Sequence, residues 1–283
     1  MVNLDGSRFR LLDAYPDRKM QLFPLAWAAD GSRIFVQSGD EDVDPADMGL
    51  YTVRSSDGGD LSRIMVTPPP PGYGQGFQVS PDGARLLEAT VLPRASQPDL
   101  TTLFVANADG PRRHQVSPRD PNTTVIQLEF WGGISEAWSP DGSQIAFCAF
   151  VDPDFHTALL LVKPDGSGLD QIVPTATGAI SVRWSPDGKL LAFTSEVGPD
   201  NQIALIRPDG TGLKKLTDGA DGSVSLGPVW SPDGTKLHFQ RKLNGHVTLW
   251  TMNADGTGQT LLSRTPLATE LVGEYAWWPP RGK

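Results

Sequence analysis

Two kinds of tight turn alternate along the whole chain of 283 residues. The first reads Trp-Ser-Pro-Asp-Gly and occurs six times, three of them with changes in the motif, and the second is an Asp-Gly pair that also occurs six times. Recurrence of this kind predicts a repeat architecture before any other feature is considered. The first turn begins at Trp27, Val79, Trp138, Trp184, Trp230 and Trp278, and the second at Asp5, Asp57, Asp109, Asp165, Asp209 and Asp255.

Each turn favours a hairpin, because Ser, Pro, Asp and Gly suit successive positions of a type I turn and the glycine tolerates positive φ. The segments between turns alternate apolar and polar residues with period two, as in residues 190–194 and 248–252, which is typical of strands. One repeat therefore predicts strands A to D, with the first turn between A and B and the second between C and D. Trp138, Trp184 and Trp230 share one position in the repeat, so we expect each to pack between neighbouring repeats.

The motif Trp-Ser-Pro-Asp-Gly-x-x-Leu/Ile-x-Phe followed by an Asp-Gly turn resembles the WD40-like (PD40) repeat of TolB-type propellers. The resemblance covers essentially the whole chain and implies a six-bladed β-propeller. It also implies a periplasmic or extracytoplasmic location. The same repeat occurs in propeller domains of prolyl-oligopeptidase-type and tricorn-type peptidases, so it indicates architecture much better than function.

The predicted fold is all-β, with a single domain over residues 1–283 built from six four-stranded antiparallel blades. Residues 1–13 match the end of strand C, the second turn and strand D, whereas residues 274–283 match strand A and its turn. Pairing of these N- and C-terminal segments would complete blade six, close the ring and bury edge strands. Strand B of that blade has no counterpart, which predicts either a three-stranded blade or a trimmed longer chain.

Charge and hydropathy narrow the classes of partner. The formal net charge is −9 with a pI near 4.9, so no basic surface for nucleic acid is expected. The N-terminus has no apolar leader, and the longest aliphatic stretch, residues 158–162, is far too short for membrane insertion. The single cysteine, Cys148, lies in an apolar strand and is expected to be buried.

Antiparallel strands place all A-to-B and C-to-D turns on one face, which we name the turn face. The B-to-C loops and D-to-A connections share the opposite face, named the loop face. Insertions at residues 38–50, 90–101 and 117–135 fall on the loop face, where recognition is expected. An alternative is that they only cover a hydrophobic seam. The candidate binding residues there are Asp42, Asp44, Arg94, Glu129, Phe130 and Trp131.

The mouth of the central channel is the second candidate site, because the start of strand A brings polar residues near the axis. These side chains could hold a metal, a carbohydrate or a peptide terminus, or could simply line a solvated channel. No cofactor is predicted, although a divalent metal in the channel stays open. The acidic segment 40–44 lacks the glycine and glutamate of an EF-type loop, and the four histidines show no metal spacing. The channel candidates are Glu136, Arg183, Glu274 and Tyr275.

The expected function is a non-enzymatic binding scaffold, because the repeat accounts for the chain and leaves no catalytic motif such as Gly-x-Ser-x-Gly. Its expected partner is a protein or a peptide on the loop face. One alternative is a metal-dependent enzyme comparable to six-bladed lactonases and lyases, with its chemistry in the channel. Another is a substrate-gating or sensor propeller cut from a longer chain.

Overall fold

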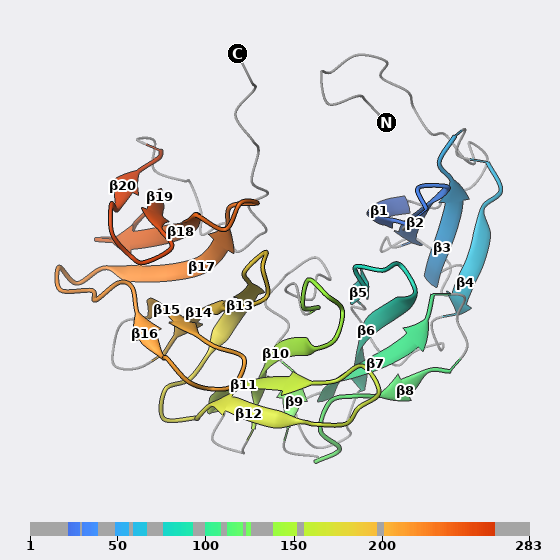
Figure 1. Cartoon of the computed structure of the whole chain (residues 1–283), viewed down its shortest axis with the longest axis horizontal. Helices are drawn as coiled ribbons and strands as arrows, with labels where there is room; N and C mark the ends of the chain where they lie inside the picture. The colour runs from blue at the N-terminus through green and yellow to red at the C-terminus, as the bar shows by residue number, and fades with distance from the viewer. Residues whose placement is uncertain are drawn as a thin grey trace.

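All regular elements that the structure describes are β-strands, which confirms the predicted all-β class. They form five four-stranded antiparallel sheets, which follow one another in chain order around a common centre (Figure 1). The computed structural model describes residues 22–28, 30–38, 49–56, 59–66, 76–92, 100–108, 112–120, 123–125, 138–151, 156–196 and 201–263.

Each sheet is one blade, and its strands pair in sequence order from the inner edge outward. The outer strands of blades two, four and five have only two residues, so each of these three blades presents a short outer edge. Blade one contains β1 (Leu22–Trp27), β2 (Arg33–Ser38), β3 (Gly49–Arg54) and β4 (Ser62–Val66), and blade two contains β5 (Gly76–Val79), β6 (Arg85–Leu92), β7 (Leu100–Asn107) and β8 (His114–Gln115). Blade three contains β9 (Thr124–Val125), β10 (Ile145–Phe150), β11 (Thr157–Val162) and β12 (Asp170–Val173), blade four contains β13 (Ile180–Trp184), β14 (Leu191–Ser195), β15 (Gln202–Ile206) and β16 (Lys214–Lys215), and blade five contains β17 (Val224–Trp230), β18 (Lys236–Leu243), β19 (His246–Asn253) and β20 (Thr260–Leu261).

The segments predicted to form blade six, residues 1–13 and 274–283, lie outside the described residues. Among the pairings that the structure describes, none joins blade one to blade five. The predicted count of six blades and the predicted ring closure therefore remain predictions.

The insertion in blade two is shorter than predicted. Residues 90–92 and 100–101 continue the β6–β7 hairpin, with Thr90 opposite Thr102 and Leu92 opposite Leu100. The spacing between turns did not reveal this, because extra residues give the same spacing whether they lengthen the hairpin or form a loop, although threonine and valine favour strands.

Strand A of blade three also differs from the prediction. The short strand β9 pairs with the far end of β10, where Val125 lies opposite Ala149, while Trp138 bridges Ile145 near the start of β10. Between these two contacts β10 covers four residues, from Ala149 to Ile145, whereas the inner segment covers thirteen, from Val125 to Trp138. The predicted insertion at 117–135 therefore does not simply precede strand A, because Thr124 and Val125 lie inside it and already pair with β10.

The core lies between the blades, as the predicted repeat requires. The tryptophans of three successive blades are equally buried, with exposed fractions of 7% for Trp138, 6% for Trp184 and 8% for Trp230. Each belongs to a cluster with the preceding blade; Trp184, for example, packs with Cys148 of β10. Burial of Cys148 is also confirmed, and it raises the pKa of that thiol to about 12.

Candidate functional site

The turn face is built from one repeated set of hydrogen bonds within the Ser-Pro-Asp-Gly turn, which we name the bracket. In blades two to five the serine of the first turn donates its hydroxyl to the aspartate two residues later, with Oγ to Oδ1 distances between 2.5 and 2.7 Å. The same serine Oγ accepts the backbone N–H of the residue five positions on, at 2.9 Å in each blade. These bonds explain why the motif recurs almost unchanged, and they occupy its polar side chains. The four serine and aspartate pairs are Ser80 and Asp82, Ser139 and Asp141, Ser185 and Asp187, and Ser231 and Asp233.

Adjacent brackets touch through proline and glycine. A Cβ built at Gly188 would lie 3.6 Å from Cδ of Pro140 in the preceding blade, and a Cβ at Gly234 would lie 3.6 Å from Cδ of Pro186. Each glycine also has positive φ, near 70°. The turns of successive blades therefore form an inner row in which the same glycine-to-proline contact recurs.

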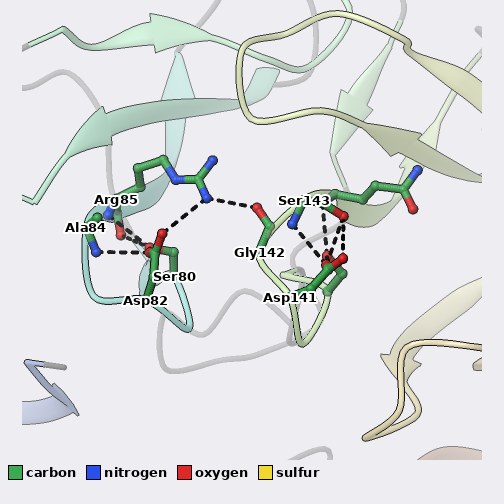
Figure 2. A network of polar contacts seen from close by, with 9 residues as sticks. Ser80, Asp82, Ala84, Arg85, Asp141, Gly142 and Ser143 are labelled. Atoms are coloured by element: carbon green, nitrogen blue, oxygen red, sulfur yellow. Dashed lines mark hydrogen bonds and ion pairs between the residues drawn. The ribbon is translucent and has the colours of Figure 1, made fainter.

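Figure 2 shows the junction between blades two and three on this face. The Arg85 guanidinium donates to the carbonyl oxygen of Gly142 at 2.9 Å and lies 3.5 Å from an oxygen of Asp82. It also lies over the Trp138 ring, 5.1 Å from the centroid. Arg85 thus joins its own turn to the turn and tryptophan of the next blade, so its role is structural.

The aspartates of the brackets are held ionised. The Ser185 hydroxyl and the Lys189 side chain lower the pKa of Asp187 to about 2, and the Ser231 hydroxyl with the Thr235 backbone lowers the pKa of Asp233 to about 2. The turn face therefore carries a regular row of negative charges at neutral pH. Because each charge already serves a turn, the row by itself does not define a binding site.

The loop face differs from blade to blade. In blade five the B-to-C connection is a two-residue turn, in which Asn244 and Gly245 have φ of 52° and 79°, the signature of a type I′ hairpin. In blades one and two the corresponding strands end at Ser38 and Leu92 and resume at Gly49 and Leu100. Among the connections that the structure describes, the loop face therefore has no repeated set of bonds like that of the turn face, and its strand ends give no common loop length.

Side chains tie the described loop-face connections to the strands. Thr157, at the start of β11, hydrogen-bonds to the carboxylate of Glu196 and accepts the N–H of Ala179 at 2.8 Å. Gly178 has φ of 59°, and a Cβ there would lie 2.9 Å from both Glu196 Cβ and Thr157 Oγ1. The connection between blades three and four is therefore closely packed against both of them.

A second group of side-chain contacts joins the connection before blade five to strand β18. The Arg241 guanidinium pairs with Asp221 at 2.6 Å, donates to Ser223 Oγ at 2.9 Å and stacks on Trp250 at 4.7 Å. Sequence reasoning missed Arg241 and Glu196. The only signal available was their position at the loop-face ends of strands β18 and β14, and position alone does not distinguish a structural tie from a binding residue.

Blade two contains an ion pair between a buried carboxylate and a partly exposed arginine, which the sequence also did not reveal. Glu88 on β6 is almost fully buried and pairs with Arg113, with Nε to Oε2 at 2.7 Å. The Thr90 hydroxyl donates to the other carboxylate oxygen at 2.7 Å, and Arg113 stacks on Phe104 at 3.5 Å. All donors and acceptors of this group come from one blade, which indicates a structural role.

Of the predicted site residues, only Arg183 lies in the part of the chain that the structure describes. It lies on the inner strand β13, where the prediction places it, and it is buried. Its Nη1 donates to the carbonyl oxygen of Val182 at 3.0 Å, and its own carbonyl oxygen accepts Trp230 Nε1. The other predicted site residues, Asp42, Asp44, Arg94, Glu129, Phe130, Trp131, Glu136, Glu274 and Tyr275, lie outside the described residues.

The described ranges contain no group of three or more histidine, cysteine or carboxylate side chains placed to hold a metal ion. They also contain no helix with the length and apolarity needed to cross a bilayer.

Comparison with known proteins gives one family and several solved structures of the same fold. The model of the PD40 family, described as a TolB beta propeller domain, matches residues 102–270, which is more than half of the chain. No curated protein matches. A putative TolB from Agrobacterium tumefaciens is similar in structure, with a TM-score of 0.58 and 19% identity over 92% of this chain and 86% of that one.

Two enzymes share the fold as well. An oligogalacturonate lyase in complex with manganese has a TM-score of 0.62 and 15% identity, over 84% of this chain and 64% of the lyase. A puromycin-hydrolyzing peptidase from Mycobacterium tuberculosis has a TM-score of 0.59 and 15% identity, over 87% of this chain and 39% of the peptidase. At such identities the similarity establishes the propeller fold alone.

Proposed function

The chain belongs to the TolB β-propeller family, and from that premise we propose that it is a non-enzymatic scaffold that recognises a protein or peptide through its loop face. The observation that carries the proposal is the difference between the two faces. On the turn face the same serine, proline, aspartate and glycine recur in each of blades two to five, and internal bonds occupy them. On the loop face the connections differ in length and in side chains, which is where a rigid scaffold places recognition.

The proposed binding surface has two parts. Asp42, Asp44, Arg94, Glu129, Phe130 and Trp131 would contact the partner from the loop-face insertions. At the channel mouth, Glu136, Arg183, Glu274 and Tyr275 would contribute polar groups. Arg183 would have to become exposed on binding, because it is 8% exposed and its carbonyl oxygen already accepts Trp230 Nε1.

The scaffold is proposed to be a six-bladed ring completed by residues 1–13 and 274–283. Five blades of the same construction are present, and the first turn of blade six is represented in the sequence at residues 278–282. An extracytoplasmic location is proposed on the family resemblance. The scaffold needs no cofactor in this proposal.

The test is photo-crosslinking from single positions on the two faces. A benzophenone amino acid at His246, an exposed position on the loop face, should crosslink the partner when the full chain is expressed in its native host. The matched control replaces Lys189, whose side chain is 80% exposed beside Asp187 on the turn face. The proposal fails if both positions capture the same proteins equally, or if the loop-face position captures none.

The manganese complex of the similar lyase makes a metal-dependent lyase the second candidate. Its discriminating measurement is the metal content of the purified protein, followed by incubation with oligogalacturonate and Mn²⁺. Stoichiometric metal together with unsaturated products would favour the enzyme and overturn the scaffold proposal. The third reading, a gating propeller of a longer polypeptide, is tested by the length of the protein in its native host.

A further inference from the structure

His114 lies at the outer rim, where blade two meets blade three. It belongs to the two-residue outer strand β8 and is half-buried. Its Nε2 lies 2.9 Å from the carbonyl oxygen of Pro164, in the C-to-D turn of blade three, and its Nδ1 lies 3.0 Å from the carbonyl oxygen of Arg112. Both ring nitrogens of one histidine therefore face backbone acceptors, one beside its own strand and one on the neighbouring blade.

The two acceptors determine which form of the ring fits between them. A carbonyl oxygen can only accept a hydrogen bond, so each contact needs an N–H on the ring. Neutral imidazole carries one N–H, and its other nitrogen would present a lone pair to a carbonyl oxygen at hydrogen-bonding distance. Imidazolium carries two N–H groups and satisfies both oxygens at once. The geometry is therefore complementary to the protonated ring.

The equivalent position in blade four carries a lysine. Lys214, like His114, stands five residues after the aspartate of an Asp-Gly turn, and the two residues pair with equivalent positions of strand C, Leu205 and Val105. The Lys214 Nζ donates to the carbonyl oxygen of Asp255 at 2.8 Å, in the C-to-D turn of blade five. Two blades thus use one position to donate from the outer strand to the turn of the next blade. Lysine is a cationic donor at any pH near neutrality, whereas histidine is cationic only in acid.

The hydrogen bond from His114 adjoins an apolar contact between the same two blades. A Cβ built at Gly166 would lie 3.4 Å from the carbonyl oxygen of Gln115 and 4.0 Å from Val116 Cγ1. Val116 is 3% exposed. The turn at residues 163–168 therefore packs directly on β8 and on the residue that follows it. A change of charge at His114 acts on a closely packed junction.

We propose that His114 is a protonation-dependent latch between blades two and three. The protonated ring donates to Pro164 and to Arg112 at once and holds the turn of blade three on β8, whereas the neutral ring keeps only one of these bonds. The latch strengthens the junction in acid, and this contribution is lost as the pH rises through the range in which imidazole gives up its proton. The proposal concerns the propeller itself and does not depend on the proposed binding function.

The other charged groups that the structure describes at this junction keep their charge over that range. Strand β7, which pairs with β8, contains no charged residue between Leu100 and Asn107. Hydrogen bonds from the side chain and the backbone N–H of Ser167 lower the pKa of Asp165, so its carboxylate stays ionised. Only histidine has an unperturbed side chain that changes its charge between pH 5 and 8. The charged residues flanking the two contacts are Arg112, Arg113, Lys163 and Asp165, with Arg113 paired to Glu88.

The strand that the latch holds leads into a loop-face insertion. Beside His114, the side chain of Gln115 donates to the carbonyl oxygens of Ser117 and Pro118 at 3.2 and 3.0 Å. These are the first residues of the insertion at 117–135. The latch therefore acts at the base of that insertion, and the mobility of the described residues 112–120 reports on it.

The test compares His114→Gln with Lys214→Gln in the full chain. Glutamine keeps a neutral N–H donor but gains no charge in acid. His114→Gln should lower the melting temperature by about 2 to 4 °C at pH 5.5 and by less than about 1 °C at pH 8. The matched control Lys214→Gln should lower it equally at both pH values, because lysine is charged at both. Equal losses from His114→Gln at the two pH values would overturn the proposal, as would a larger loss at pH 8.

Amide exchange gives a local readout of the same pair of proteins. At any one pH the intrinsic exchange rates are nearly the same in the two proteins, so a difference between the unmodified chain and His114→Gln reports on structure. Residues 112–120 should exchange faster in the variant at pH 5.5, and the difference should disappear at pH 8. A difference of the same size at both pH values would show that the ring acts through its shape alone.

Magnetic resonance of the unmodified chain, labelled with ¹⁵N in histidine, tests the double donation without any substitution. Ring N–H protons in hydrogen bonds exchange slowly with water and stay visible, whereas those of an exposed histidine such as His246 do not. His114 should give two ring N–H signals at pH 5.5 and one at pH 8. A single signal at pH 5.5 would contradict the latch.

Discussion

The indole Nε1 of Trp230 donates a hydrogen bond to the backbone carbonyl oxygen of Arg183, 3.3 Å away on the preceding blade. This contact joins the inner strand of blade five to the inner strand of blade four. The same tryptophan packs against Ala192 and Leu205 of blade four, so one side chain contributes both a polar and an apolar link. Trp230 thus stabilises the junction between blades four and five, and the sequence identifies this residue through its turn motif.

Replacement of Trp230 should separate these two contributions. Trp230→Phe keeps most of the packing and loses the bond to Arg183, so we expect the free energy of unfolding to fall by about 1 kcal/mol. Trp230→Ala also leaves a cavity and should cost about 3 to 5 kcal/mol. Urea unfolding followed by circular dichroism measures both. Equal effects of the two substitutions would show that packing of the ring contributes little.

Arg85 should stabilise the junction between blades two and three. Arg85→Ala removes its bond to Gly142 and its contact with Trp138, and we expect a loss of about 1 to 2 kcal/mol. The matched control is Lys189→Ala, which removes an exposed ion pair with Asp187 and should cost less than about 0.5 kcal/mol. Thermal unfolding of the two variants side by side decides whether the bridge is structural.

Removal of Arg113 should be costly, because it leaves the carboxylate of Glu88 buried without its cation. We expect Arg113→Ala to lower the free energy of unfolding by about 3 kcal/mol at pH 7. Adding Glu88→Gln to that variant removes the unpaired charge and should restore part of the loss. A double-mutant cycle measures the coupling, and strictly additive effects would contradict the ion pair as drawn.

Acid should weaken the turn face. The folded-state pKa of Asp187 and Asp233 is about 2, below the usual 3.8, so their contribution to stability is complete above pH 3.8 and is lost as the pH falls toward 2. The double variant Asp187→Asn/Asp233→Asn keeps oxygen acceptors but no longer titrates there. Its melting temperature should fall less steeply between pH 4 and pH 2 than that of the unmodified protein. Parallel curves would show that the pKa values of these carboxylates do not differ between the folded and the unfolded protein.

Gly178 and Gly222 offer a matched pair on the loop face. Both have positive φ, but a Cβ at Gly178 would meet Glu196 and Thr157, whereas one at Gly222 meets nothing within 4 Å. Gly222→Ala should therefore cost about 1 kcal/mol of backbone strain alone. Gly178→Ala should cost about 1 to 3 kcal/mol more, because the connection must move. Similar melting temperatures would show that the Thr157 and Glu196 contact yields freely.

Local chemistry made much of this fold predictable. The Ser-Pro-Asp-Gly and Asp-Gly turns adopt their conformation through bonds within five or six residues, so the sequence by itself was sufficient to predict the strands, the four-stranded blades and the equivalent burial of Trp138, Trp184 and Trp230. Its prediction of the family rested on the same turns, and the match over residues 102–270 confirms it.

Contacts between distant residues were decided by the tertiary structure alone. The pairing of β9 with the end of β10, the ion pair of Glu88 and Arg113, and the contact of Arg241 with Asp221 join residues 20 to 26 positions apart, at which no turn motif acts. The exposure of Leu262 likewise has no signal in its own segment. Leu262 is 48% exposed and Leu216 is 8% exposed, although both stand seven residues after the aspartate of an Asp-Gly turn. Burial depends on which blade lies alongside, and that is a property of the tertiary structure.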